Sequence, residues 1–150
     1  MNQRGFTLVE LMVVLVVMGI LANIAIPVYH NAKDHADAAS MLADFHTIKS
    51  AAFDCFSATN EFPRTSGWGR IPREMEGRLP RDFDFRYKDN VYRWWRVSLG
   101  PRIAARLPFQ HILVFQVRGS DPDVLESLKG IYQGQYAFAT RNMVTIYIMV

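Results

Sequence analysis

Cysteine is scarce in this chain of 150 residues: Cys55 is the only one, and a lone cysteine excludes an internal disulfide. Free cysteine packs as a small hydrophobe, so we predict that Cys55 is buried on the apolar face of a helix. Charge is absent from residues 11–26, which contain no Asp, Glu, Lys or Arg. Nearly all charge therefore belongs to the later part of the chain, where a folded domain is expected.

Sequence motifs of catalysis are missing as well. His30 and His35 are five residues apart, which does not place two imidazoles on one helix face, and a zinc cluster would need a second cysteine. The chain has no Gly-x-Ser-x-Gly elbow, phosphate loop or Gly-x-Gly-x-x-Gly string. Asp121 and Asp123 supply too few oxygens for a calcium site. We therefore expect no catalytic residue, no metal and no cofactor.

The middle of the chain is basic. Residues 58–118 hold twelve Lys and Arg against six Asp and Glu, within an overall formal charge of +3. Such an excess attracts anionic partners, including nucleic acid and lipid headgroups, although surface charge more often serves only solvation. Both interpretations stay open at this point.

Tryptophan and arginine occur together within this basic region. The set comprises Arg64, Trp68, Arg70, Arg93, Trp94, Trp95 and Arg96. Arginine neutralises phosphates while aromatic faces stack on bases, so Arg93, Arg96, Trp94 and Trp95 are candidate DNA contacts. Successive side chains of a strand point to opposite faces, so we expect one of the two adjacent tryptophans in the core.

The longest apolar run covers residues 6–26, which as a helix would be about 31 Å long, close to the thickness of a hydrocarbon core. Arg4 precedes it, which favours an N-terminus in the cytoplasm. A cleaved secretory signal would have a shorter apolar region ending in small residues at A-x-A spacing, which residues 22–25 do not supply. A plain signal anchor explains the length but not Glu10, because a carboxylate in a membrane helix is costly and usually functional.

The pair Arg4-Gly5, the Phe-Thr-Leu-Val-Glu string at 6–10 and the aliphatic run behind it resemble the N-terminal segment of type IV pilins and type II secretion pseudopilins. The resemblance implies that a prepilin peptidase cuts between Gly5 and Phe6, that Phe6 is then N-methylated, and that Glu10 acts in filament assembly. Cleavage creates a positive α-amino group, which in an apolar bundle needs a carboxylate partner. Glu10 of a neighbouring subunit would supply it.

The same resemblance covers about the first 30 residues and implies that Gly19 and Pro27 bracket a helix segment that loosens in assembled filaments. Proline removes a helical N–H and clashes with the preceding turn, so Pro27 is expected to kink or interrupt the helix. Major type IV pilins close a C-terminal loop with a disulfide, which Cys55 cannot form alone. This departure favours a minor pilin, a pseudopilin or a lineage without the bridge.

After Pro27, the alanine-rich sequence predicts that the helix resumes and runs to about Ser57. Its apolar residues recur at spacings of three and four, which predicts a stripe that packs on a sheet: Ala38, Leu42, Phe45, Ile48, Ala52, Cys55 and Phe56. Residues 59–89, rich in proline and glycine, predict a long ordered loop or several short turns. The other expected elements are strands at 92–97 and 111–117, a helix at 124–129 with Asp121 at its start and Gly130 as its stop, and a hairpin of 136–139 and 144–149.

These expectations combine into a pilin-like α+β fold, with a long N-terminal helix packed on a small antiparallel sheet. Its parts would be a leader peptide, a transmembrane and filament-core helix, an amphipathic helix half and a globular head, at residues 1–5, 6–27, 28–57 and 58–150. The head would contain the sheet. The precursor would span the bacterial inner membrane once, through the transmembrane half of the helix.

The expected function is that of a structural, non-enzymatic subunit of a type IV pilus or a type II secretion-like filament, in the periplasm or at the cell surface. Expected partners are prepilin peptidase, other subunits and the inner-membrane assembly machinery. Two alternatives stay open: a minor pilin whose basic, aromatic head binds DNA in uptake, and an unrelated signal-anchored membrane protein.

Overall fold

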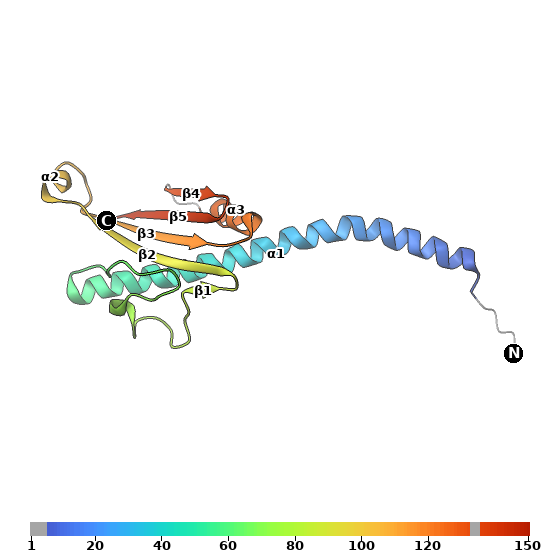
Figure 1. The fold of residues 1–150 in the computed structure, drawn as a ribbon, viewed down its shortest axis with the longest axis horizontal. Coiled ribbons are helices and arrows are strands. Elements are labelled where there is room, and N and C mark those ends of the chain that lie inside the picture. The colour runs from blue at the N-terminus through green and yellow to red at the C-terminus, as the bar shows by residue number, and fades with distance from the viewer. Residues whose placement is uncertain (1–5, 133–135) are drawn as a thin grey trace. The chain divides into compact units, whose positions relative to one another are not determined.

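The computed structural model describes residues 6–132 and 136–150, and it divides into two compact units, Met1–Asp34 and His35–Val150. Helices and strands follow one another along the chain as drawn in Figure 1. The elements are α1 (Leu8–Thr59), the 3-10 helix η1 (Arg73–Met75), β1 (Arg86–Tyr87), β2 (Asn90–Ser98), α2 (Pro101–Ala104), β3 (His111–Arg118), α3 (Pro122–Ile131), β4 (Ala137–Thr140) and β5 (Met143–Met149).

Helix α1 is continuous from Leu8 to Thr59, so the helix is not interrupted at Pro27, and a kink there stays a prediction. Proline removes one hydrogen bond, and the hydrogen bonds of the turns on both sides of it keep the helical backbone. The helix ends two residues beyond the predicted Ser57. Asn60 follows with a positive φ of 56°, a conformation that asparagine tolerates, and its N–H donates to the carbonyl of Phe56 at 2.7 Å.

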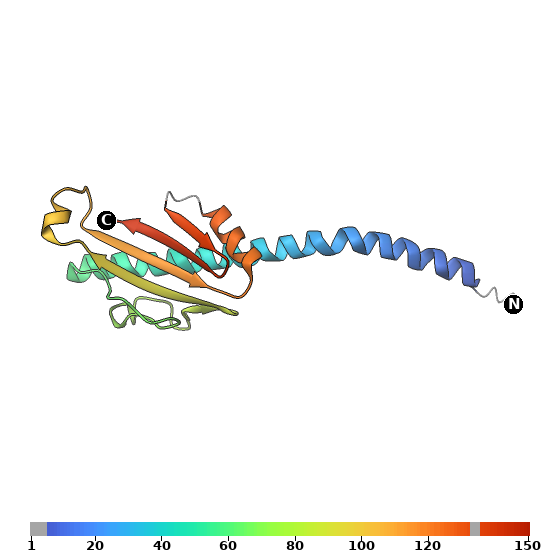
Figure 2. The same cartoon turned by 45° about the horizontal axis from the view of Figure 1, so that its top comes forward.

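The five strands form one antiparallel sheet in the order β1-β2-β3-β5-β4. The strands predicted at 92–97 and 111–117 are confirmed within β2 and β3, and the C-terminal hairpin is confirmed as β4 and β5. Long β-branched and aromatic runs explain β2, β3 and β5, since such side chains fit a pleated, half-buried surface. Figure 2 shows the strands side by side across the part of α1 that belongs to the second unit.

The core lies between one face of the sheet and the helices α1 and α3. The predicted stripe of α1 is largely confirmed, because Ala38, Phe45, Ile48 and Ala52 are buried, and so is Cys55. Phe45 joins helix and sheet through ring contacts with Phe115 of β3. Helix α3 adds three buried residues, Val124, Leu125 and Leu128. The pilin-like α+β fold predicted from the sequence is therefore observed, with a long N-terminal helix packed against a five-stranded antiparallel sheet.

One local prediction needs correction, one is confirmed, and three short elements were not predicted. Gly130 does not stop α3, which continues to Ile131. Glycine weakens a helix without ending it when the neighbouring turn packs on a core, and Leu128 and Ile131 do so here. Asp121 does begin α3, because its side chain accepts a hydrogen bond from the N–H of Asp123. The long loop contains η1 and β1, and the β2–β3 connection contains α2, elements too short for a periodic signal.

Candidate functional site

Thr7 and Glu10 form a reciprocal cap at the start of α1. The N–H and the hydroxyl of Thr7 donate to Oε2 of Glu10 at 2.8 and 2.9 Å, and the N–H of Glu10 donates to the Thr7 hydroxyl at 3.2 Å. This is a capping box, which satisfies N–H groups that have no partner within the helix. Glu10 therefore has an intramolecular partner, Thr7, that our reading of the sequence missed, although the Thr-x-x-Glu spacing before an apolar run was a signal for it.

The surface of the first unit is apolar and uncovered. Every residue from 6 to 33 is exposed, among them Leu15, Ile20 and Ile24. In the part of the chain that the structure describes, α1 is the one helix long and apolar enough to cross a membrane. So large an apolar surface is stable only in lipid or against other protein surfaces.

Asn23 lies one turn before Pro27, and its carbonyl loses the donor that a residue other than proline would supply. The side-chain amide of Asn23 donates to the Gly19 carbonyl at 3.0 Å. Asn23 thus lies between Gly19 and Pro27, the positions predicted to bracket a loosened segment. Its side-chain amide competes with backbone N–H groups for a helix carbonyl. Loosening of this segment in a filament stays a prediction.

The strand β2 separates the four candidate DNA contacts onto two faces. Trp94 is fully buried, and its ring N–H donates to the carbonyl of Pro63 at 3.1 Å. Arg96, on the same inner face, donates to the carbonyl of Phe62 at 2.5 Å. Both residues hold the 62–63 segment, so their assignment as DNA contacts is not supported by their positions. Arg93 and Trp95 share the outer face, as strand alternation requires.

Four side chains meet on the outer face of the sheet, and we call Trp68, Arg93, Trp95 and Arg118 the Arg–Trp cluster. The guanidinium of Arg93 lies 5.7 Å from the Trp68 ring centre and 5.2 Å from that of Trp95. The guanidinium of Arg118 lies 4.3 Å from the Trp68 ring centre. Distances below about 6 Å are typical of cation–π contacts. Trp68, Arg93 and Trp95 belong to the basic, aromatic set found in the sequence, whereas Arg118 of β3 lies outside that set and is brought to Trp68 only by strand pairing.

The first 25 residues match the family model described as the prokaryotic N-terminal methylation motif. The match covers Gly5, Phe6 and Glu10 together with the apolar run. The chain carries the prokaryotic N-terminal methylation motif. The resemblance to pilins and pseudopilins stated from the sequence is therefore confirmed for this segment.

Curated relatives of this chain are of two kinds, secretion-system core proteins and type IV pilins. A type II secretion system core protein G from Klebsiella michiganensis is 43% identical over 65 residues, 43% of this chain and 45% of that protein. The corresponding protein of Escherichia coli (strain K12) is 36% identical over 68 residues, 45% and 46% of the two chains. The type IV major pilin protein PilE1 of Neisseria gonorrhoeae is 30% identical over 85 residues, 55% and 52%. The chain spans about half the length of the curated relatives it matches, and no solved structure matches it.

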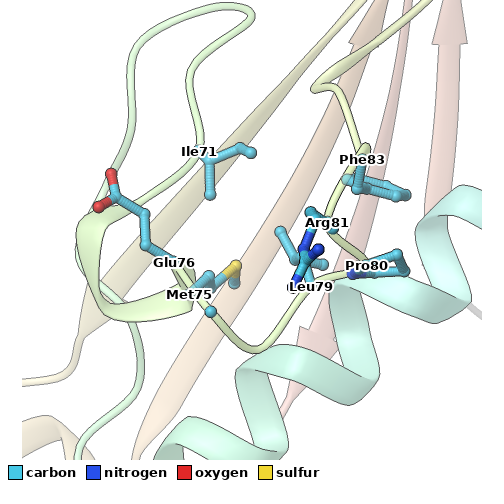
Figure 3. Close-up of a pocket in the computed structure, with 8 residues that line it drawn as sticks. Ile71, Met75, Glu76, Leu79, Pro80, Arg81 and Phe83 are labelled. Carbon is cyan, nitrogen blue, oxygen red and sulfur yellow. The ribbon is translucent and has the colours of Figure 1, made fainter.

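The hollow beside the 3-10 helix η1 has a largely apolar lining. Its volume is about 540 Å³, and it opens in the loop between α1 and β1 (Figure 3). Ile71, Met75, Leu79 and Phe83 give it apolar walls, and Glu76 and Arg81 lie on opposite sides of it. No nucleophile or imidazole lines it. Among the described residues, no group of three or more His, Cys, Asp or Glu is placed to hold a metal ion.

Two aspartates of α1 tie the helix to the sheet. Tyr92 of β2 donates its hydroxyl to Oδ2 of Asp44 at 2.7 Å, and Tyr87 of β1 donates to Asp37 at 3.1 Å. Burial raises the pKa of Asp44, and the hydrogen bond from Tyr92 offsets part of that rise. Asp44 is thus protonated more readily in the folded than in the unfolded chain, and ionising it at neutral pH costs stability.

Replacing Asp44 with asparagine is therefore expected to preserve the hydrogen bond from Tyr92 and to remove the cost of burying a charge. The free energy of unfolding at pH 7 should be equal to or above that of the wild type. The difference should vanish as the pH falls below the unfolded pKa of aspartate, about 3.9, because the wild-type carboxyl is then protonated in both states. Tyr92→Phe, the matched control, should instead lose about 1 kcal/mol. Thermal unfolding followed by circular dichroism from pH 3 to 8 measures the stability of both variants. An asparagine variant that is less stable than the wild type at pH 7 contradicts this account.

Proposed function

We propose that this chain is a structural subunit of a filament of the type IV pilus or type II secretion kind. One observation carries the proposal: the methylation motif coincides with a helical segment whose apolar surface is entirely exposed in the single chain. Lipid would cover this surface in the precursor, and the helices of neighbouring subunits would cover it in the filament. Curated relatives of both kinds support this class of function.

The proposed life of the chain has two stages. As a precursor it spans the bacterial inner membrane once, with Arg4 on the cytoplasmic side. A prepilin peptidase then cuts between Gly5 and Phe6 and Phe6 is methylated, after which the inner-membrane assembly machinery adds the subunit to a periplasmic or cell-surface filament. Glu10 would pair with the new α-amino group of a neighbour. We propose that the role of the chain is structural and not enzymatic.

Processing tests this proposal directly. Because Gly5 precedes the Phe6–Glu10 string, protein extracted from membranes should begin at a methylated Phe6. Intact-mass measurement with N-terminal sequencing checks this. A mature chain that starts at Met1, or beyond Ala25, would favour an unrelated signal-anchored or secreted protein instead. As a control, Gly5→Phe should leave the precursor uncut but still inserted in the membrane.

A second candidate function is DNA binding by the head, as in a minor pilin acting in uptake. The observation that favours it is the position of Arg93 and Trp95 together on the outer face of the sheet, where Trp95 is 40% exposed. Trp94 and Arg96 do not support DNA binding, because their side chains lie on the inner face and donate hydrogen bonds to the Pro63 and Phe62 carbonyls. This function adds to filament assembly and does not replace it, because it uses the second unit and assembly uses the first.

A further inference from the structure

The outer face of the sheet carries arginine and no acid. Side chains that alternate outward from β2, β3 and β5 are aliphatic, aromatic, amide or hydroxyl groups, apart from Arg93 and Arg118. The hairpin from Val91 to Ser120 contains five arginines and no aspartate or glutamate. Arg86 of β1, opposite Val91, adds a third cation to the same face. A one-signed surface of this kind attracts a polyanion.

The cations of the Arg–Trp cluster are held by aromatic rings. No salt bridge to Arg93 or Arg118 occurs among the residues that the structure describes, and Nε of Arg93 is buried there without a hydrogen-bond acceptor. Stacking on Trp68 and Trp95 fixes the guanidinium groups without neutralising their charge. The cluster therefore presents ordered positive charge that a phosphate oxygen can still neutralise.

Backbone hydrogen bonds place Trp68 beside β2. The N–H of Ser66 donates to the Trp94 carbonyl at 2.9 Å, and the N–H of Gly69 donates to the Tyr92 carbonyl at 2.8 Å. Gly69 has a φ of +64°, which favours glycine, and a side chain there would meet Arg86. The loop thus covers the free edge of β2 and sets Trp68 against the outer face, so the cluster is largely formed before any ligand arrives.

We propose that the Arg–Trp cluster and Arg86 form a binding site for single-stranded nucleic acid. This inference rests on the second candidate function and is independent of filament assembly. Three cations without a salt bridge among the described residues can neutralise phosphates, and the exposed ring of Trp95 offers a stacking platform beside them. A duplex keeps its bases stacked on one another and cannot use such a ring, so the site distinguishes single strands from duplexes. An acidic polysaccharide would meet the charge alone.

The test uses the full chain in a non-ionic detergent with a fluorescein-labelled 20-nucleotide single strand, the same strand as a duplex, and heparin. Binding is followed by fluorescence anisotropy from low to moderate salt. Three variants are compared: Arg93→Gln with Arg118→Gln, Trp95→Ala, and Trp95→Phe. The matched control is Arg102→Gln with Arg106→Gln, which removes two exposed arginines of the same hairpin, one in α2 and one in the turn that follows it. Circular dichroism shows which variants are folded.

We expect the single strand to bind more tightly than the duplex. The Arg93 and Arg118 pair should lower the salt slope by about 1.4, since each lost phosphate contact on a single strand contributes about 0.7. Trp95→Ala should weaken single-strand binding about five- to 150-fold, the effect of losing one stacked base, and leave heparin binding unchanged. Trp95→Phe should keep most of the single-strand affinity that Trp95→Ala loses. The control pair should leave the single-strand salt slope within about 0.3 of wild type, in contrast to the cluster pair.

Each contrary result has a defined meaning. Equal or tighter duplex binding, or equal slopes for the cluster pair and the control pair, overturns the single-strand site and leaves DNA binding by the head in place. A Trp95→Ala effect of equal size on heparin overturns the stacking and indicates an acidic-polymer surface. Absence of binding at low salt overturns both the site and the second candidate function, while the processing of Gly5 and Phe6 tests the filament proposal separately.

Discussion

Glu10→Ala should be inserted and cleaved like the wild type but incorporated poorly into filaments. The substitution removes a polar group from an apolar helix, so membrane insertion is not impaired. It leaves the α-amino group of a neighbouring Phe6 without its carboxylate, and a buried charge that loses its partner costs about 3–5 kcal/mol. Shearing of cells followed by immunoblotting measures incorporation, and membrane fractionation with intact-mass measurement confirms insertion and cleavage.

The capping box adds two variants that separate the cap from the charge. Glu10→Gln retains a side chain that caps Thr7, because glutamine serves at this position of a capping box, but it carries no charge. Thr7→Ala keeps the carboxylate and loses the cap, at about 1 kcal/mol of helix stability. If pairing with a neighbour drives assembly, Glu10→Gln should fail as Glu10→Ala does, and Thr7→Ala should assemble. The reverse pattern would show that the cap and not the charge is needed.

Trp94→Ala should destabilise the second unit by about 3–5 kcal/mol, the usual cost of deleting a buried aromatic side chain. Trp94 is fully buried, and its loss also leaves the Pro63 carbonyl without the ring N–H that it accepts. The free energy of unfolding, from denaturant titration of the full chain in detergent, measures the effect. For comparison, Trp95→Ala removes a side chain of the same size from the neighbouring position.

Trp95 is 40% exposed on the other face, so Trp95→Ala should cost much less, about 1 kcal/mol. The contrast isolates burial, because the two variants share chemistry and strand. Equal losses from Trp94→Ala and Trp95→Ala would mean that the outer face is covered in the protein as measured. In that case the single-strand site would also be closed.

Much of the fold could be predicted because it depends on local patterns. The uncharged run before Tyr29 and the Gly5–Glu10 string identify the N-terminal segment. Apolar spacings of three and four give the buried face of α1, and alternation gives opposite faces to Trp94 and Trp95. These features rest on side-chain periodicity and backbone geometry, which act within a few residues.

Tertiary structure alone decided which face of β2 is the buried one and what meets it there. Periodicity pairs Arg93 with Trp95 and Arg96 with Trp94, but only packing against α1 buries Tyr92 and Trp94 and turns Arg96 to the Phe62 carbonyl. Arg118 joins Trp68 through strand pairing across 50 residues of sequence, which no local pattern encodes. The sequence thus determined the motif, the helix and the alternation, whereas long-range register and loop docking assembled the Arg–Trp cluster.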